Sequence, residues 1–300
     1  MFAITILTGL GTPAFAGNGA IHPECGAMYG SAGNDGTNPG SIFLISQVDG
    51  SQTFIGDPTT DGGLSGIAFD DQARLWGSNV FGGADSNLIQ INPTDGTLIN
   101  DVGQIKDASG NGMKVQDLAF DPVSKQLFGT SFDVLLTIDR ATGIATSVGA
   151  LPNEPMHIGF GPGGTLWGVD RNSGGDLFTL DPSNANVLTQ VPRSPTGYEL
   201  DALGVDPSTG IIWVAGTTYE GNGPEVNTID SAGNRVIVGS GVRVVADLDF
   251  LPCPVVVGGE GLSIDSTALI LAGAQSATWM IPVILSIIGI GVFVISKKSE

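Results

Sequence analysis

The chain has 300 residues, of which 11 are lysine or arginine and 30 are aspartate or glutamate, so its formal net charge at pH 7 is −19. Such an acidic chain is expected to repel nucleic acid and anionic lipid, since binding to phosphates needs clusters of Lys and Arg. The 46 Gly and 17 Pro residues indicate many short segments joined by turns. No long amphipathic helix is predicted before residue 260.

Residues 1–16 are predicted to be a signal peptide. The segment from Phe2 to Leu10 is apolar, and Ala14-Phe15-Ala16 has the small-residue pattern of a cleavage site. The basic residues that usually precede the apolar segment are missing, because the first basic residue of the chain is Arg74. A buried apolar strand is the alternative. On the first interpretation, residues 17–257 form an exported domain.

The stretch from Val115 to Gly149 shows the building unit of this domain. It contains short runs rich in β-branched or aromatic side chains and bounded by Asp-Pro, Gly or Asn, as is typical of strands. The runs are residues 116–122, 125–130, 135–139 and 145–149. Together they predict a small antiparallel sheet, which needs neighbours of its own kind to bury both of its faces.

Three phrases of this stretch recur, and each occurs five times. The first phrase ends at Phe69, Phe120, Phe160, Val205 and Phe250. The second contains Tyr29, Trp76, Phe128, Trp167 and Trp213, each before Gly or Val. The third covers residues 42–46, 88–92, 135–139, 177–181 and 226–230. The spacing of roughly 40 to 50 residues is the period of propeller blades. The sequence therefore predicts an all-β, five-bladed β-propeller, with the five aromatic residues in its core.

The phase of the repeats predicts how the ring closes. The first phrase is missing at the N-terminus, and the last one, around Phe250, has no later strands to complete a blade. One blade is therefore expected to combine a C-terminal inner strand with three N-terminal outer strands. Cys25 and Cys253 would then lie where the other blades have a tight turn, so we expect a disulfide between them. Two unrelated buried thiols are the alternative.

A candidate ligand or metal site is predicted in the central channel. The position three residues before the end of the first phrase holds, around the ring, Gly66, Asp117, His157, Ala202 and Asp247, and Asp201 lies next to one of these positions. Asp117, His157, Asp201 and Asp247 are the candidate ligands for a divalent metal such as calcium, manganese or zinc. The structural alternative is that the aspartates cap the backbone of a neighbouring strand and that His157 only lines the channel. Asp70, Asp121 and Asp206 are predicted to form turns.

Four Gly- and Asn/Asp-rich loops are predicted to share one face of the disc. They are Ser31 to Gly40, Asn79 to Ser86, Asp170 to Asp176 and Thr217 to Glu225. Loops on a rigid scaffold often carry binding sites. Solvated turns without a special function are the alternative for each of them.

The C-terminal part is predicted to anchor the domain in a membrane. Residues 258–275 are predicted to be a linker, 276–296 a transmembrane helix and 297–300 a cytoplasmic tail. The stretch from Trp279 to Ile295 is apolar except for one serine, and Lys297-Lys298 follows it. Such a stretch is long enough to span a bilayer, and the basic pair indicates the cytoplasmic side. A buried core helix is the alternative.

Two parts of the chain resemble known groups. The repeat with Leu118-Ala119-Phe120-Asp121-Pro122 and Leu136-Thr137-Ile138-Asp139-Arg140 resembles the blades of secreted bacterial and archaeal propellers of the YVTN, NHL and quinoprotein-like groups. The C-terminal part, with Trp279-Met280-Ile281-Pro282 and Lys297-Lys298, is similar to an anchor that recurs on archaeal surface proteins. The first resemblance implies the fold and the second implies the location, but neither implies an activity.

These observations predict a single-pass protein of the cell membrane whose extracellular propeller binds a protein or glycan of the envelope, without binding nucleic acid. No catalytic motif such as Gly-x-Ser-x-Gly or His-Glu-x-x-His occurs. A metal-dependent, lactonase-like hydrolase is the alternative, because lactonase-like propellers hold a metal with carboxylates and Asn, which Asp117 and Asp247 match only in part. A purely structural component that packs laterally in the envelope is a further alternative.

Overall fold

The computed structural model describes residues 23–34, 38–58, 62–80, 85–152, 156–171, 175–192, 198–218, 224–240 and 244–253. They belong to one compact unit, Met1–Cys253, and a second unit covers Pro254–Glu300. The predicted signal peptide, linker, transmembrane helix and cytoplasmic tail lie outside the described residues. Across the described ranges, no helix is long and apolar enough to cross a membrane.

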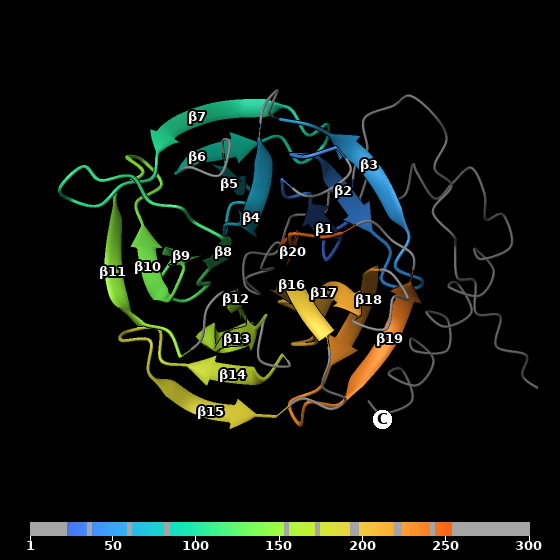
Figure 1. Ribbon diagram of the computed structural model, residues 1–300. Helices are drawn as coiled ribbons and strands as arrows, with labels where there is room; N and C mark the ends of the chain where they lie inside the picture. Colours follow the sequence, from blue (N-terminus) through green and yellow to red (C-terminus); the bar gives the residue numbers. More distant parts are fainter. Residues whose placement is uncertain are drawn as a thin grey trace, which may run out of the picture. The chain divides into compact units, whose positions relative to one another are not determined.

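The described strands form five separate antiparallel sheets of four strands, arranged in a ring (Figure 1). The second blade contains β4 (Gly63–Phe69), β5 (Leu75–Val80), β6 (Ser86–Ile91) and β7 (Leu98–Gln104). The third contains β8 (Asp117–Phe120), β9 (Leu127–Ser131), β10 (Val134–Ile138) and β11 (Ala145–Ala150). The fourth contains β12 (Met156–Phe160), β13 (Leu166–Asp170), β14 (Leu177–Leu180) and β15 (Val187–Val191). The fifth contains β16 (Tyr198–Val205), β17 (Ile212–Thr218), β18 (Pro224–Ile229) and β19 (Arg235–Ser240). The predicted five-bladed propeller is confirmed.

The remaining blade, called the shared blade, joins the two ends of the domain. Its strands are β20 (Asp247–Phe250), β1 (Met28–Ser31), β2 (Ile42–Ile45) and β3 (Gln52–Gly56), in this order. The sequence-distant strands β20 and β1 pair in antiparallel fashion, and the Cys25–Cys253 disulfide lies just beyond the paired residues, with its Cα atoms 4.6 Å apart. The predicted closure and the predicted disulfide are both confirmed.

The blades pack against each other through the repeated aromatic residues. Tyr29, Trp76, Phe128 and Trp213 are buried, whereas Trp167 is partly buried. The ring of Tyr29 in the shared blade lies 4.9 Å from that of Phe69 in the second blade, and the rings of Phe128 and Phe160 in the third and fourth blades lie 5.1 Å apart. An aromatic residue of one blade thus contacts the inner strand of the next, which explains why the phrase recurs in every blade.

The hairpin turns follow from aspartates at fixed positions. The Oδ1 atoms of Asp139, Asp181 and Asp230 each accept a hydrogen bond from the backbone N–H two residues later, at 2.7–2.9 Å. The predicted turn formers Asp121 and Asp206 accept the same kind of bond, and so confirm that prediction. These bonds satisfy backbone N–H groups within the turns and so favour short strand-to-strand connections.

Candidate functional site

The inner strands β4, β8, β12, β16 and β20 surround the centre of the ring (Figure 1). The candidate residues predicted there are buried: Asp117 and Asp247 are 0 % exposed, and His157 and Asp201 are 7 % and 8 % exposed. Each lies on an inner strand, as the repeat predicted.

The carboxylates of Asp117 and Asp247 bind the backbone of neighbouring blades. Asp247 Oδ2 accepts a hydrogen bond from Ile67 N of β4 at 2.6 Å, and Asp117 Oδ2 accepts one from Ile158 N of β12 at 2.5 Å. Because each bond joins two inner strands that belong to different sheets, both aspartates connect blades that share no strand pairing.

The two carboxyl groups also interact with each other. Burial is the largest cause that raises the pKa of both, and a side-chain hydrogen bond joins Asp117 to Asp247. The inner strand β4 also lies close to β8. Gly66 of β4 allows this, since a Cβ atom there would lie 2.7 Å from Asp117 C. Two buried carboxyls in contact cannot both ionise at low cost, so the pair retains a proton near neutral pH.

The other two predicted residues have separate partners. His157 Nδ1 lies 3.7 Å from Asp117 Oδ2, and among the described residues it has no hydrogen-bond partner. Burial lowers the pKa of His157 to about 3, so its imidazole is neutral at pH 7. Asp201 Oδ1 accepts an ion-paired hydrogen bond from Arg171 Nε at 2.8 Å. Within the described ranges, no group of three or more His, Cys, Asp or Glu side chains is placed to hold a metal ion.

Asp249 belongs to the same central region and was not predicted. Its Oδ2 accepts a hydrogen bond from Phe69 N at 2.5 Å, and burial raises its pKa to about 7. The signal in the sequence is the alternation Asp247-Leu248-Asp249-Phe250, which puts both acids on one face of β20. Both acids accept backbone N–H groups of β4, so the central carboxyls connect the shared blade to the second blade.

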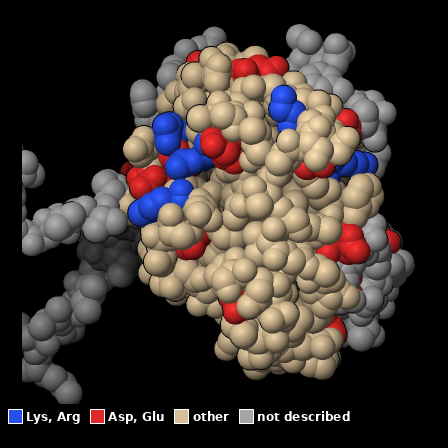
Figure 2. Space-filling model, turned by 90° about the vertical axis from the view of Figure 1, so that its left-hand side faces the viewer, with Lys and Arg blue, Asp and Glu red and all other residues tan. Residues whose placement is uncertain are grey.

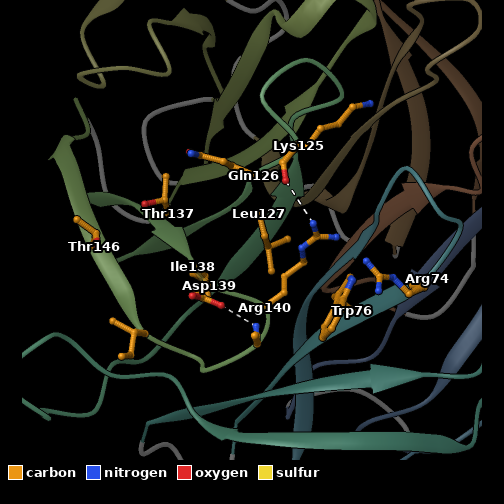
Figure 3. A pocket seen from close by; sticks show the side chains of 12 residues that line it. Arg74, Trp76, Lys125, Gln126, Leu127, Thr137, Ile138, Asp139, Arg140 and Thr146 are labelled. Atoms are coloured by element: carbon orange, nitrogen blue, oxygen red, sulfur yellow. Dashed lines mark hydrogen bonds between the residues drawn. The ribbon is translucent and has the colours of Figure 1, made fainter.

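A second candidate site is a pocket of about 720 Å³ between the second and third blades. Its lining includes three basic side chains and one acidic side chain: Arg74, Lys125, Arg140 and Asp139. They come from the turns between β4 and β5, β8 and β9, and β10 and β11, and Figure 3 shows them around Trp76 and Leu127. Hairpin turns and the adjoining strand ends therefore line this pocket.

A buried carboxylate, that of Asp70, binds three side chains that line the pocket. Asp70, with a side chain that is 0 % exposed, accepts hydrogen bonds at Oδ2 from Arg74 Nε at 2.7 Å, Arg140 Nη1 at 2.5 Å and Trp76 Nε1 at 3.0 Å. Burial acts to raise the pKa of Asp70, but the hydrogen bonds from Trp76, Arg74 and Gln72 outweigh it and hold the pKa below its usual value. Asp70 is thus an ionised carboxylate that fixes two guanidinium groups from two blades.

Lys125 completes the basic lining. Its backbone oxygen accepts a hydrogen bond from Arg140 Nη2 at 3.3 Å, drawn as a dashed line in Figure 3, and its Nζ lies 3.5 Å from Asp71 Oδ2. Its side chain is 52 % exposed. In the side view of the disc, Lys and Arg side chains gather in small groups beside Asp and Glu, and much of the remaining face is uncharged (Figure 2).

Sequence reasoning did not predict this pocket. It assigned Trp76 to the core and Asp70 to a turn, and both assignments are confirmed, but neither shows that Arg140 of the next blade reaches the same carboxylate. The loops predicted to form a binding face lie partly outside the described residues. The only available signal was the occurrence of basic residues at turn positions in a strongly acidic chain.

Comparisons with known proteins show the fold alone. No family model and no curated protein match the chain. A solved protein of unknown function from Bacteroides caccae is 10 % identical, with a TM-score of 0.50, and the match covers 75 % of this chain and 99 % of that one. TolB from Acinetobacter baumannii is 12 % identical over 72 % of this chain and 53 % of its own, with a TM-score of 0.46. A putative 6-phosphogluconolactonase from Bacteroides uniformis is 13 % identical over 73 % and 83 %, with a TM-score of 0.44. The first likeness bears on the fold alone, and none of the three assigns an activity.

Proposed function

We propose that this chain is a binding propeller, exported to the cell surface and held at the membrane by its C-terminal apolar stretch, that recognises a component of the cell envelope. The observation that carries the binding role is the pocket between the second and third blades. It has a volume of about 720 Å³, lies on rigid turns, and presents charged groups that a buried carboxylate holds in place. A volume of this size is typical of small-molecule sites.

The central channel supports the hydrolase alternative less well. Asp117 and Asp247 each use a carboxylate oxygen on a backbone N–H of a neighbouring blade, and burial raises the pKa of both. A carboxyl that retains its proton near neutral pH is a poor metal ligand, since ligands must be deprotonated. The proposed export and membrane anchor are supported by the apolar segments within residues 1–16 and 276–296 of the sequence.

Site-directed photo-cross-linking tests this proposal. The full-length chain, reconstituted in lipid nanodiscs with its disulfide intact, carries a photoreactive label on Gln126→Cys at the pocket. A matched variant carries the label on Leu188→Cys, which is exposed on the outer strand of the fourth blade. Both are irradiated with isolated envelopes of the producing cells.

We expect a discrete adduct from Gln126→Cys and none from Leu188→Cys. Equal adducts at both positions, or none at Gln126→Cys, would contradict a binding role for the pocket. Hydrolysis of a lactone by the chain, lost in Asp117→Asn, would favour the hydrolase instead.

A further inference from the structure

We propose that the pocket between the second and third blades binds a carboxylate attached to a sugar ring, such as a uronic acid, with Arg74 and Lys125 as the groups that contact the anion. This inference rests on the proposed binding function and names its ligand class. The pocket lining holds three cationic side chains and one anionic side chain. Asp70 pairs with the two arginines and Asp71 with the lysine, so these cations are held in place next to carboxylates.

The basic residues are not needed by the turns that carry them. Arg140 follows the turn aspartate of the third blade, and the same position in the other blades holds Gln47, Pro93, Pro182 and Ser231. Arg74 precedes the start of β5, and the equivalent residues elsewhere are Ala27, Gln126, Thr165 and Ile211. At each of these two positions the other four blades have no arginine, so the turn geometry does not require one. Both arginines instead share Asp70 as a partner, which places them at one pocket.

Lys125 is a third basic residue that the local backbone does not require. Its φ is +62°, in the left-handed region that favours glycine, and the equivalent positions of the fourth and fifth blades hold Gly164 and Gly210 with φ of +82° and +74°. A lysine in this conformation costs a little backbone energy relative to glycine. Its side chain is 52 % exposed at the pocket, and its Nζ also lies 3.5 Å from Asp71 Oδ2, so a ligand carboxylate would share this charge with Asp71.

The geometry of the cations fits a small planar anion. Asp70 uses Arg74 Nε and Arg140 Nη1, and so fixes both guanidinium groups at the pocket while the Arg74 side chain stays 39 % exposed. Among the described residues, the terminal nitrogens of Arg74 form no hydrogen bond or ion pair. Guanidinium groups held in this way bind carboxylates through paired, charge-assisted hydrogen bonds.

The rest of the lining favours a hydroxyl-bearing ring over a bare anion. Gln126, Thr137 and Thr146 contribute amide and hydroxyl groups, and Ile144 contributes apolar surface. A cavity of about 720 Å³ is large enough for one or a few sugar rings. The acidic charge of the whole chain disfavours long polyanions, so a single carboxylate is better matched than a nucleic acid.

Methyl glucuronide and methyl glucoside test the proposal, because they differ only in a carboxylate against a hydroxymethyl group. Binding to the full-length chain in nanodiscs is measured by ligand-observed NMR, with sulfate, phosphate and a short polyglutamate peptide as competing probes. We expect methyl glucuronide to bind, methyl glucoside to bind at least about tenfold more weakly, and the difference to shrink in high salt.

Charge variants locate the binding. Arg74→Gln and Lys125→Glu are expected to weaken methyl glucuronide binding about tenfold, because each removes a charge-assisted contact. Arg171→Gln removes one positive charge at Asp201, outside this pocket, and is expected to leave the affinity unchanged. Lys125 is half-exposed, so Lys125→Glu is expected to fold even if Arg74→Gln does not.

Three results would overturn the proposal: equal binding of both glycosides, equal affinity in all the variants, or stronger binding of sulfate, phosphate or polyglutamate than of methyl glucuronide. If such a result comes with a persistent Gln126→Cys cross-link, the ligand class is wrong but the binding function stands. If the cross-link is also absent, both fail.

Discussion

The centre of the ring and the pocket on its turns both depend on buried aspartates, but they use them in opposite ways. Asp70, Asp117 and Asp247 are all at most 1 % exposed. Asp70 faces two guanidinium groups and has a lowered pKa, whereas Asp117 and Asp247 face each other and backbone N–H groups and have raised pKa values. The hydrogen-bond partners therefore decide whether a buried carboxyl is charged, and for Asp70 the partners that lower the pKa, Trp76, Arg74 and Gln72, belong to its own blade. The ionised Asp70 fixes two guanidinium groups at the pocket, whereas the protonated pair Asp117 and Asp247 connects blades.

The largest effect is expected at the disulfide, which lies in the shared blade where the other blades have a tight turn. Removing it in a Cys25→Ala/Cys253→Ala variant should lower the free energy of unfolding by about 4 kcal/mol, because the bond closes a loop of 228 residues in the unfolded chain. Urea denaturation of the oxidised chain and of the variant measures this. A loss below about 1 kcal/mol would show that strand pairing and packing alone close the ring.

The next effect tests the charged aspartate of the pocket. Asp70→Asn should lower the free energy of unfolding at pH 7 by about 3 kcal/mol, since it leaves two guanidinium groups without their shared carboxylate. Asp206→Asn is the matched control, because Asp206 holds the equivalent turn of the fifth blade through Ser208 and Thr209. The control should lose about 1 kcal/mol. Equal losses would mean that Asp70 acts only as a turn former.

The close approach of inner strands at the centre is tested by adding a single methyl group. Gly66→Ala should destabilise the chain by about 2 kcal/mol, because the new Cβ would meet Leu118 N at 2.6 Å and Asp117 C at 2.7 Å. Gly161→Ala, where the nearest atoms are side-chain atoms at 3.3 Å or more, is the control and should change stability little. Thermal unfolding of both variants decides whether the contact at the centre is tight.

The smallest effect concerns pH. Asp249 has a folded pKa of about 7, above its usual value, so the folded state binds this proton more tightly and its contribution to stability is lost as the pH rises through about 7. Asp249→Asn keeps an oxygen that can accept the Phe69 N–H. The variant should therefore be more stable than the parent by about 1 kcal/mol at pH 8, with a flatter dependence between pH 5 and 7. A destabilised variant at pH 8 would show that the ionised carboxylate is preferred there.

Much of the fold could be predicted from the sequence because its determinants are local and repeated. Strand-length runs, turn aspartates and one aromatic per blade recur with a fixed period, and the phase of that period indicated a shared blade. The pairing of Cys25 with Cys253 followed from that phase. The central positions of Asp117, His157 and Asp247 also followed, because equivalent positions of a ring lie at equivalent places.

The partners of those residues depend on how neighbouring blades face each other, which no single repeat encodes. The sequence alone determined that Asp117 and Asp247 are central and that Asp121 and Asp206 form turns, but not that Asp249 is central as well. Only the tertiary structure decided that Arg140 reaches Asp70 across a blade boundary, and that Asp117 and Asp247 meet each other beside Gly66. The physical reason is that strands and turns arise from contacts within a blade, whereas the pocket and the central carboxyl pair arise from side chains that different blades bring together.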